Sequence, residues 1–498
     1  MKNYLKVFEN RRMLFTLILG FASGLPLALT GQAMQAWLTM DQVDTATIGF
    51  FTLVAQPYSY KYLWSPLMDR FEPPLFGRRR GWLIFTQFLL AGIIFIMSLI
   101  SPSQQSTMFS IVAVFIAFIS ASQDIVIDAY RTDLLSAEER GAGAALGVLG
   151  YRLAMLVSGG LAFIWADHVG WSSTYQLISL IMLTMAVLTI FSPKLSLEKV
   201  KPTSEAKQDL LGFLNMIVFA VGGFFVGRYL LILGFSLNPN DESKWIQLLF
   251  VIIEILFALP FSYIGARIAK FQTLLHSLHD YFDKKGAWHF LLLIILFKLG
   301  DAFAGSLGTN FLLKGVGFTQ IEVGTINKIF GLIATLGGAL LGGALMVRLR
   351  LFKSLLFFAV LQALSNLGFW YLSVAGKGAW GEVLIPGMSI QIDPLLLTVV
   401  MFENVTGGMG TAAFVALIMS LCSSQFTATQ YALLSAFAAV GRIYVGPVSG
   451  VLAVSLGWPV FFLFSLFAAL PGIGMVLMLK SKINKLEFLS TGGAAEND

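Results

Sequence analysis

The sequence predicts an all-α membrane protein with fourteen transmembrane helices, arranged as two six-helix bundles with two extra helices between them. Three observations support this prediction: the composition, the spacing of the apolar segments and an internal repeat. Of the 498 residues, 57% are hydrophobic and 12% are charged, whereas a soluble domain carries roughly 25% charged residues. Lipid is therefore the expected solvent for most of the surface.

Long apolar segments divide the whole chain. A helix needs about 20 apolar residues to cross a bilayer, and windows of that size give fourteen candidates. They lie near 13–38, 47–66, 82–100, 107–130, 143–164, 172–192, 210–234, 246–268, 288–313, 321–346, 353–374, 394–419, 429–454 and 458–479. The first of them lacks a small-residue cleavage site after a short apolar region, so we expect a retained span and not a cleaved signal peptide.

The loops between these segments differ in charge. If the N-terminus is inside, most lysines and arginines fall in cytoplasmic loops, and the opposite loops hold only Lys244, Lys314 and Lys377. This asymmetry predicts an even number of spans with both termini cytoplasmic. It also accounts for the net charge of +6 without a nucleic-acid partner.

The chain repeats itself at an offset of 291 residues. Gly150 matches Gly441, and Ser158-Gly159 matches Ser449-Gly450. Two parallel halves of six spans are the plan of the major facilitator superfamily, in which the substrate site lies between the halves near the bilayer midplane. We therefore expect one bundle in 1–193, a linker with the two extra helices in 194–287, a second bundle in 288–480 and a cytoplasmic tail in 481–498.

Two carboxylates interrupt the span near 107–130. An ionisable group in a span costs several kcal/mol unless it is paired or wet. Asp124 and Asp128 are four residues apart and share one helix face, and Gln123 is adjacent. Because two carboxylates repel and burial favours the protonated form, one of them is a candidate proton carrier. The alternative is a structural pair with Arg131 or Arg152.

The second half carries its own buried charges. Lys298 and Asp301 are three residues apart, so that Lys298 neutralises Asp301 or Asp301 carries a proton. Glu403 and Asn404 lie just before a glycine-rich segment that permits close helix approach. Glu403 is a further candidate for proton coupling, and Lys298, Asn404 and Gln123 are candidates for binding cargo.

Five more residues are candidates for contacting cargo. Lys61 is too deep in its span for easy snorkelling and suits a carboxylate of the cargo or one of the two aspartates. Arg152 and Arg442 each open a glycine-rich stretch, where they bind acidic cargo or lock helices. Gln35 and Trp37 could bond or stack on a sugar, although tryptophan is also common at the membrane interface.

A loop after the second predicted span carries a gating signature. Asp69 and Arg70 are followed by Gly77 and three arginines, which resembles the signature that facilitators carry between spans two and three. Such a charge network, made in one state and broken in the other, biases the rocking of two halves. In the linker, Arg228 and Glu254 lie at similar depth and are expected to pair.

Several classes of function are disfavoured. The single cysteine, Cys422, permits no internal disulfide, and the pair His276 and His279 has no further ligand types nearby. No HExxH, GxSxG or phosphate-binding loop occurs. We therefore expect neither an enzyme nor a metalloprotein, and no cofactor other than the proton as coupling ion.

Long segments of the chain resemble the AmpG-type muropeptide permeases of Gram-negative bacteria. They include LGFASGLPLALTGQAMQAW (19–37), ASQDIVIDAYRTDLL (121–135) and FENVTGGMGTAAFVALIMSLC (402–422). The resemblance covers nearly the whole chain and is weakest at 194–287 and after 480.

This resemblance implies a concrete activity. Such permeases use the proton gradient to import N-acetylglucosaminyl-1,6-anhydro-N-acetylmuramyl peptides from the periplasm, for cell-wall recycling and β-lactamase induction. The expected partners are then the muropeptide and the lipid bilayer, with the protein as a monomer. The alternative is a proton-coupled facilitator for another cargo, such as a siderophore, a drug or a sugar.

Overall fold

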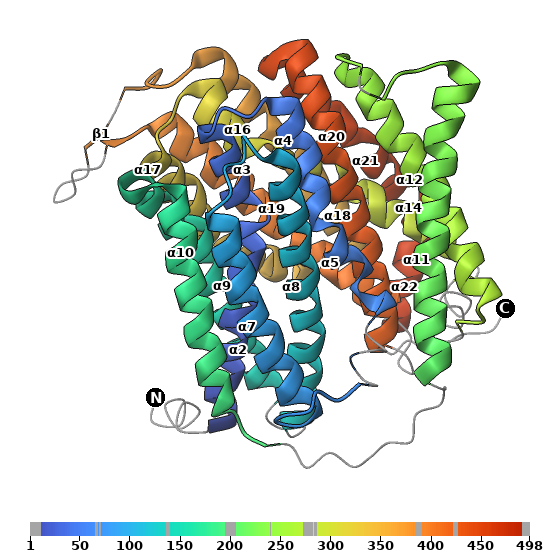
Figure 1. Ribbon diagram of the computed structural model, residues 1–498. Coiled ribbons are helices and arrows are strands. Elements are labelled where there is room, and N and C mark those ends of the chain that lie inside the picture. Colours follow the sequence, from blue (N-terminus) through green and yellow to red (C-terminus); the bar gives the residue numbers. More distant parts are fainter. Residues whose placement is uncertain are drawn as a thin grey trace.

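The computed structural model shows a molecule built almost entirely from long helices that run between two ends (Figure 1). We call the end at the top of Figure 1, which carries residues 99–105 and 235–239, the distal end. The structure describes residues 11–64, 68, 71–135, 140–194, 206–239, 241–271, 282, 286–381, 383–384, 391–421 and 427–490. Asp69, Arg70, Cys422 and the pair His276 and His279 lie outside these residues.

The first part of the chain, which we call the N-half, contains the helices up to α10. They are α2 (Arg11–Leu29), α3 (Gln32–Met40), α4 (Thr45–Phe51), η1 (Thr52–Ala55), α5 (Gln56–Tyr60), η2 (Lys61–Leu63), α7 (Arg78–Ser98), α8 (Ser106–Leu134), α9 (Arg140–Leu156), η3 (Val157–Leu161) and α10 (Ala162–Ile190).

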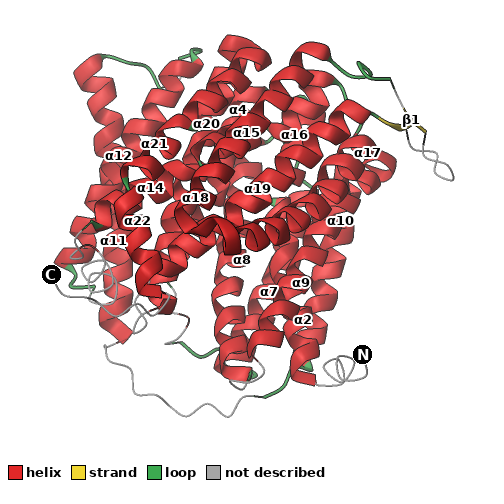
Figure 2. Cartoon of the chain, turned by 180° about the vertical axis from the view of Figure 1, so that it is seen from behind, coloured by secondary structure: helices red, strands yellow, loops and turns green. Residues whose placement is uncertain are grey.

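The rest of the chain comprises a helical hairpin and the C-half. The hairpin consists of α11 (Ala206–Tyr229), η4 (Leu230–Gly234) and α12 (Lys244–Ile268). The C-half contains α14 (Ala287–Phe297), α15 (Leu299–Ser306), α16 (Gly308–Asn310), η5 (Phe311–Val316), α17 (Gln320–Glu322), η6 (Val323–Phe330), α18 (Gly331–Ala375), α19 (Pro394–Leu421), α20 (Thr427–Ala468), α21 (Leu470–Met478) and α22 (Lys480–Ser490). Strands β1 (Val383–Leu384) and β2 (Gln391–Ile392) pair antiparallel at one edge of the distal end (Figure 2).

Eleven helical segments of the described chain are long and apolar enough to cross a membrane, so the predicted count of fourteen is not confirmed. Two of these segments, Leu146–Ile190 and Phe437–Met478, each cover two predicted spans. Gly170 and Gly457 break the helix there with φ values of 81° and 76°, and a second helix follows with no loop between. The predicted span 47–66 consists of short pieces of 7, 4, 5 and 3 residues and is not among the eleven.

A similar break within α18 uses an arginine. Arg350 has φ 62° and ψ 167°, close to the values of Gly77 before α7, φ 77° and ψ 171°. Such backbone angles are essentially confined to glycine. Arg350 therefore holds a strained conformation at a junction between two helices.

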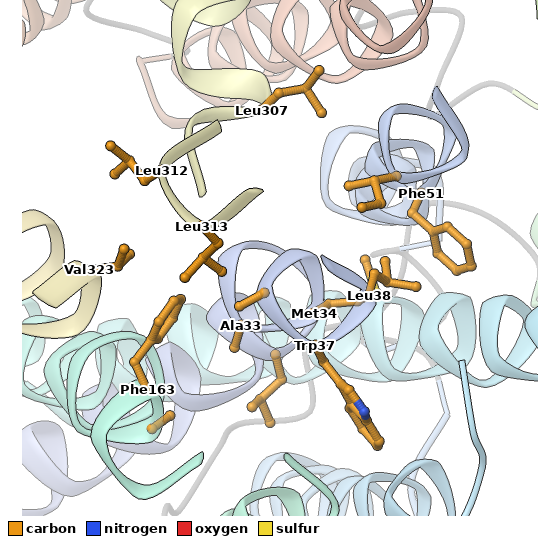
Figure 3. Close-up of a cluster of buried hydrophobic side chains, with 14 of the residues drawn as sticks. Ala33, Met34, Trp37, Leu38, Phe51, Phe163, Leu307, Leu312, Leu313 and Val323 are labelled. Carbon is orange, nitrogen blue, oxygen red and sulfur yellow. The ribbon is translucent and has the colours of Figure 1, made fainter. Parts of the chain in front are cut away.

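The largest apolar core joins the two halves at the distal end. It contains Ala33, Met34 and Trp37 of α3 together with Leu313 and Val323 of the C-half (Figure 3). Burial of apolar surface stabilises such a contact by roughly 25 cal/mol per Å². The halves are thus packed against each other at this end.

The hairpin of α11 and α12 lies at one side of the molecule (Figure 1). Its two helices are joined by the ion pair of Arg228 Nη1 and Glu254 Oε1 at 3.1 Å, which confirms the predicted pair. At the distal end, Lys244 Nζ lies 3.8 Å from Asp44 Oδ1. Burial tends to raise the pKa of Asp44, but hydrogen bonds from Thr47 and the Lys244 charge lower it below its usual value.

Candidate functional site

A charged cluster in the N-half is built around Asp124 of α8. Ser23 Oγ of α2 donates a hydrogen bond to Asp124 Oδ1 at 2.5 Å, and Lys61 Nζ lies 3.9 Å from Asp124 Oδ2. The Lys61 side chain is 36% exposed and that of Asp124 is 18% exposed. Three segments far apart in sequence therefore bring an acid, a base and a hydroxyl together where water can still reach the pair.

The neighbours of Asp124 on α8 are placed differently. Asp128 accepts from Arg131 Nη2 at 3.0 Å and its side chain is 61% exposed, so the structural pair weighed above as the alternative is formed. Gln123 is completely buried, and its side-chain amide has no hydrogen-bond partner among the described residues. Of the two aspartates, only Asp124 is both shielded and paired with a residue from another helix.

A second cluster lies in the C-half around Lys298, at the break between α14 and α15. Its Nζ lies 3.4 Å from Asp301 Oδ2, 3.3 Å from Gln362 Oε1 and 3.2 Å from Thr411 Oγ1. Gln362 belongs to α18 and Thr411 to α19. The pairing with Asp301 is the one that the spacing suggested, whereas Gln362 and Thr411 are partners that no local pattern indicated.

Glu403 of α19 extends this charged region. Asn404 Nδ2 donates to Glu403 Oε2 at 2.6 Å, and Thr335 Oγ1 of α18 donates to Asn404 Oδ1 at 2.9 Å. Asp301, Lys298 and Lys328 are the charged groups that act electrostatically on Glu403. Asn404 is thus occupied in holding Glu403 in this structure.

Lys328 of η6 was not singled out from the sequence. Its Nζ donates to Thr309 Oγ1 at 3.1 Å and lies 5.5 Å from the centroid of the Phe163 ring in the N-half. The signal that could have found it is a lone lysine well inside the apolar segment Gln320–Met346. A lysine at such depth needs a partner or water.

Comparison with known proteins shows which family the chain belongs to. The sequence model of the Major Facilitator Superfamily matches residues 17–392. The chain belongs to the Major Facilitator Superfamily. This facilitator is 45% identical over 481 residues to the anhydromuropeptide permease of Escherichia coli K12, with 96% of this chain and 82% of the relative covered. It is thus a multi-pass membrane transporter and not an enzyme.

Solved structures share the fold of this facilitator. A POT family transporter in complex with 5-aminolevulinic acid aligns with a TM-score of 0.66 at 15% identity, over 95% of this chain and 96% of that one. The POT family transporter PepTSo aligns with a TM-score of 0.59 at 11% identity, over 96% and 98%. At this identity the likeness concerns the fold alone.

Neutral groups make the hydrogen bonds between α3 and the C-half of the facilitator at the distal end. Gln35 Nε2 donates to Ser306 O at 2.7 Å, and Gln35 Oε1 accepts from Thr309 N at 3.0 Å and Asn310 N at 3.2 Å. Asn310 Nδ2 donates to Thr39 Oγ1 at 3.0 Å. These four hydrogen bonds join α3 to the α15–α16 region.

Gln35 and Trp37, the two candidates for sugar contact, are buried in this packing. The amide of Gln35 is fully engaged between the halves, and Trp37 is 7% exposed and packs on Phe109 and Tyr175. Neither side chain is open to a ligand in this conformation. In this conformation Gln35 joins the two halves, and Trp37 packs on rings of the N-half.

Closer to the middle of the helices, α4 and α5 meet α20. The hydroxyls of Tyr60 and Tyr444 are 2.8 Å apart. Gly49 approaches Gly446 and Gly450 so closely that a Cβ at Gly49 would lie 2.6 Å from Gly446 O and 2.8 Å from Gly450 Cα. The absence of side chains at these glycines allows the backbones of the two halves to touch.

The two arginine candidates lie on helices that contribute to neither charged cluster. Arg152 is half-buried on α9, and Arg442 lies on α20 in a stretch whose side chains are outside the described part. His168 and His289 are exposed. Within the described residues, no three histidine, cysteine, aspartate or glutamate side chains are grouped to hold a metal ion.

Proposed function

We propose that this facilitator is a proton-coupled importer of anhydromuropeptides. It would move GlcNAc-1,6-anhydroMurNAc peptides from the periplasm to the cytoplasm for cell-wall recycling and for the signal that induces β-lactamase. The observation that carries the proposal is the 45% identity with the Escherichia coli anhydromuropeptide permease over 96% of the chain.

The two charged clusters support proton coupling. Asp124 in the N-half and Asp301 with Glu403 in the C-half are carboxyl groups within or beside membrane-spanning helices. Each has a lysine that stabilises its charged form: Lys61 lies 3.9 Å from Asp124, and Lys298 lies 3.4 Å from Asp301. A proton that neutralises such a carboxylate would release its lysine, which changes the charge that the cluster offers to cargo.

The same lysines suit the cargo. A muropeptide carries sugar hydroxyls and several carboxylates, and a lysine released by protonation of its partner can bind a cargo carboxylate. The order of events would then be proton first and cargo second. Gln123 is completely buried here, and its amide, which has no partner among the described residues, would exchange hydrogen bonds with water or cargo only in a more open conformation.

We also propose the architecture that this role requires. Fourteen spans would form bundles over 1–193 and 288–480, with the hairpin inserted between them, in the inner membrane of a bacterium. The breaks at Gly170 and Gly457 and the short helices from Thr45 to Leu63 account for the three spans beyond the eleven. Both termini would be cytoplasmic, the distal end periplasmic and the protein a monomer.

Uptake into proteoliposomes tests the function. The full chain is reconstituted, and accumulation of radiolabelled GlcNAc-1,6-anhydroMurNAc-tripeptide is followed with and without an inside-alkaline pH gradient. We expect accumulation several-fold above equilibrium only with the gradient, and its collapse on addition of a protonophore.

Two outcomes would contradict the proposal. Uptake of the muropeptide at the same rate with and without the gradient would contradict proton coupling. It would still support the muropeptide as the cargo. No uptake of the muropeptide, together with gradient-driven accumulation of a siderophore, a drug or a simple sugar, would replace the cargo.

A further inference from the structure

A groove beside α8 takes no part in the transport chemistry proposed above. It lies between α8 and the series of short helices from α4 to η2, and its volume is about 600 Å³. Val114 in its wall is 42% exposed, and the neighbouring Ile111 and Phe115 are 47% and 55% exposed. Exposed apolar side chains on a membrane-spanning helix face lipid, so the groove opens to the hydrocarbon of the bilayer.

The α8 wall of the groove changes from polar to apolar with depth. Ser106 and Ser110 lie nearest the distal end, and Val114 and Phe118 follow at the same spacing of four residues. This spacing keeps the four side chains on one face of the helix and spans roughly 18 Å at 1.5 Å per residue. Hydroxyls thus line the end near the membrane surface and apolar groups line the deeper part, which is the order of polarity along one phospholipid.

The opposite wall follows the same order. Thr47 of α4 lies nearest the distal end, and Phe50, Leu53 and Pro57 lie deeper. Gln56 is a polar side chain of this deeper part and is only half-buried. Its amide can bond to water or to an ester group of a lipid.

Charged groups of both signs lie at the distal mouth of the groove. Asp44 caps α4 and accepts from the N–H of Thr47 at 3.0 Å, and Lys244 Nζ lies 3.8 Å from Asp44 Oδ1. The side chains of Asp44 and Lys244 are 53% and 34% exposed, so both remain open to a further partner. Asp241 and Glu242 precede Lys244 in the chain. Acids therefore outnumber the lysine among these residues, which favours a ligand that carries a cation as well as an anion.

The hairpin of α11 and α12 meets the N-half at both ends of this wall. One contact is the pair of Lys244 and Asp44, and the other is the packing of Leu63 on the cluster of Met216 and Phe271. Residues 47–64, which supply the wall of the groove, lie between the two contacts along the chain. The hairpin thus brings a cation to the mouth of the groove.

We propose that this groove binds one phospholipid of the leaflet at the distal end, with phosphoethanolamine as the preferred headgroup. The phosphate of such a lipid meets Lys244 and the hydroxyls, its ammonium meets Asp44, and one acyl chain lies along Val114 and Phe118. A phosphatidylglycerol headgroup brings the phosphate without a cation, and the acids at the mouth repel it. The site is independent of the cargo and of proton coupling.

Native mass spectrometry of the full chain tests the site. The protein in a neutral detergent is titrated with phosphatidylethanolamine, and the fraction that carries one lipid is followed against lipid concentration. Ser110→Trp places an indole inside the groove, whereas Ile111→Trp places the same side chain on the neighbouring exposed face of α8. We expect the affinity for the first lipid to fall at least about tenfold in Ser110→Trp and to stay unchanged in Ile111→Trp.

Two further variants test the headgroup. The unmodified protein should bind phosphatidylethanolamine several-fold more tightly than phosphatidylglycerol. Asp44→Asn should reduce this preference by weakening the binding of phosphatidylethanolamine, and Lys244→Met should weaken the binding of both lipids. Lys314→Met removes a lysine that is exposed on η5 of the C-half and should leave both affinities unchanged.

The site is overturned if Ser110→Trp binds phosphatidylethanolamine as tightly as the unmodified protein. If Ser110→Trp does not fold, Val114→Phe, which enlarges a smaller part of the same wall, must lower the affinity for the proposal to stand. Equal or tighter binding of phosphatidylglycerol overturns the headgroup assignment. A dimer that Ser110→Trp converts to a monomer would identify a second copy of the chain as the occupant, and this too overturns the lipid site.

Discussion

Asp124 combines a hydroxyl donor and an ammonium partner from two other helices, Ser23 at 2.5 Å and Lys61 at 3.9 Å. Asparagine keeps the shape of this side chain and still accepts from Ser23, but it cannot take up or release a proton. We therefore predict that Asp124→Asn inserts normally and loses gradient-driven accumulation of cargo. Reconstituted uptake with and without a pH gradient measures this loss.

The matched control is Asp128→Asn on the same helix. Asp128 is 61% exposed and paired with Arg131, so its replacement should leave most accumulation intact, since exposed ion pairs contribute about 1 kcal/mol or less. Full gradient-driven accumulation by Asp124→Asn would exclude Asp124 as the proton carrier.

Arg350 offers a test of backbone strain. A non-glycine residue with φ 62° and ψ 167° costs on the order of 1–3 kcal/mol. Arg350→Gly should therefore raise the free energy of unfolding of the detergent-solubilised protein by about 1 kcal/mol. The measured sign of this gain is a higher thermal unfolding midpoint. As a control, Gly170→Ala at φ 81° should lower the midpoint, and an unchanged or lower midpoint for Arg350→Gly would contradict the assignment of strain.

Residue spacing predicted some of the charged contacts and could not predict others. Lys298 and Asp301 share one helix turn, so their pairing follows from local geometry. Gln35 meets the peptide groups of Thr309 and Asn310 from the other half, and no local pattern carries that information. Lys328 was missed although it lies well inside an apolar segment, the same signal that singled out Lys61.

At the scale of helices, the closest approach of the halves is that of α4 and α20. Gly49→Val would place atoms within 2.6 Å of Gly446 O, so the distal end could not close. We predict a fall in the transport rate of at least about tenfold, equivalent to about 1.4 kcal/mol, measured as uptake in proteoliposomes.

The control for this prediction is Gly92→Val. Gly92 lies on the exposed side of α7, and a Cβ there meets nothing within 4 Å. This variant should transport normally. Normal transport by Gly49→Val would mean that α4 and α20 do not need to touch during the transport cycle.

The order of helices was more predictable than their ends. Apolar length placed α7, α8, α11 and α12 within a few residues of the predicted spans. It did not reveal that 47–66 is a series of short helices, because the hydropathy of that segment is the same for a broken and a continuous helix. The breaks at Gly170 and Gly457 need a positive φ, which apolar length does not report.

For the whole molecule, the hairpin of α11 and α12 stands apart from the two halves. Its helices pack mainly on each other. It meets the N-half at the pair of Lys244 and Asp44 and near Leu63, and α12 also contacts α20 of the C-half. We predict that replacement of 210–268 by a short linker leaves uptake partly intact. Uptake in proteoliposomes and elution as a single species in detergent check the result, and complete failure to fold would show that the hairpin is integral to the bundle.

The neutral hydrogen bonds between α3 and the C-half have an energetic consequence. The four bonds are worth about 1 kcal/mol each, or about 4 kcal/mol in total. An elementary charge that crosses about 150 mV of membrane potential releases about 3.5 kcal/mol. Breaking these hydrogen bonds therefore costs about as much as a single proton delivers, and separating the apolar core that joins the halves adds to that cost.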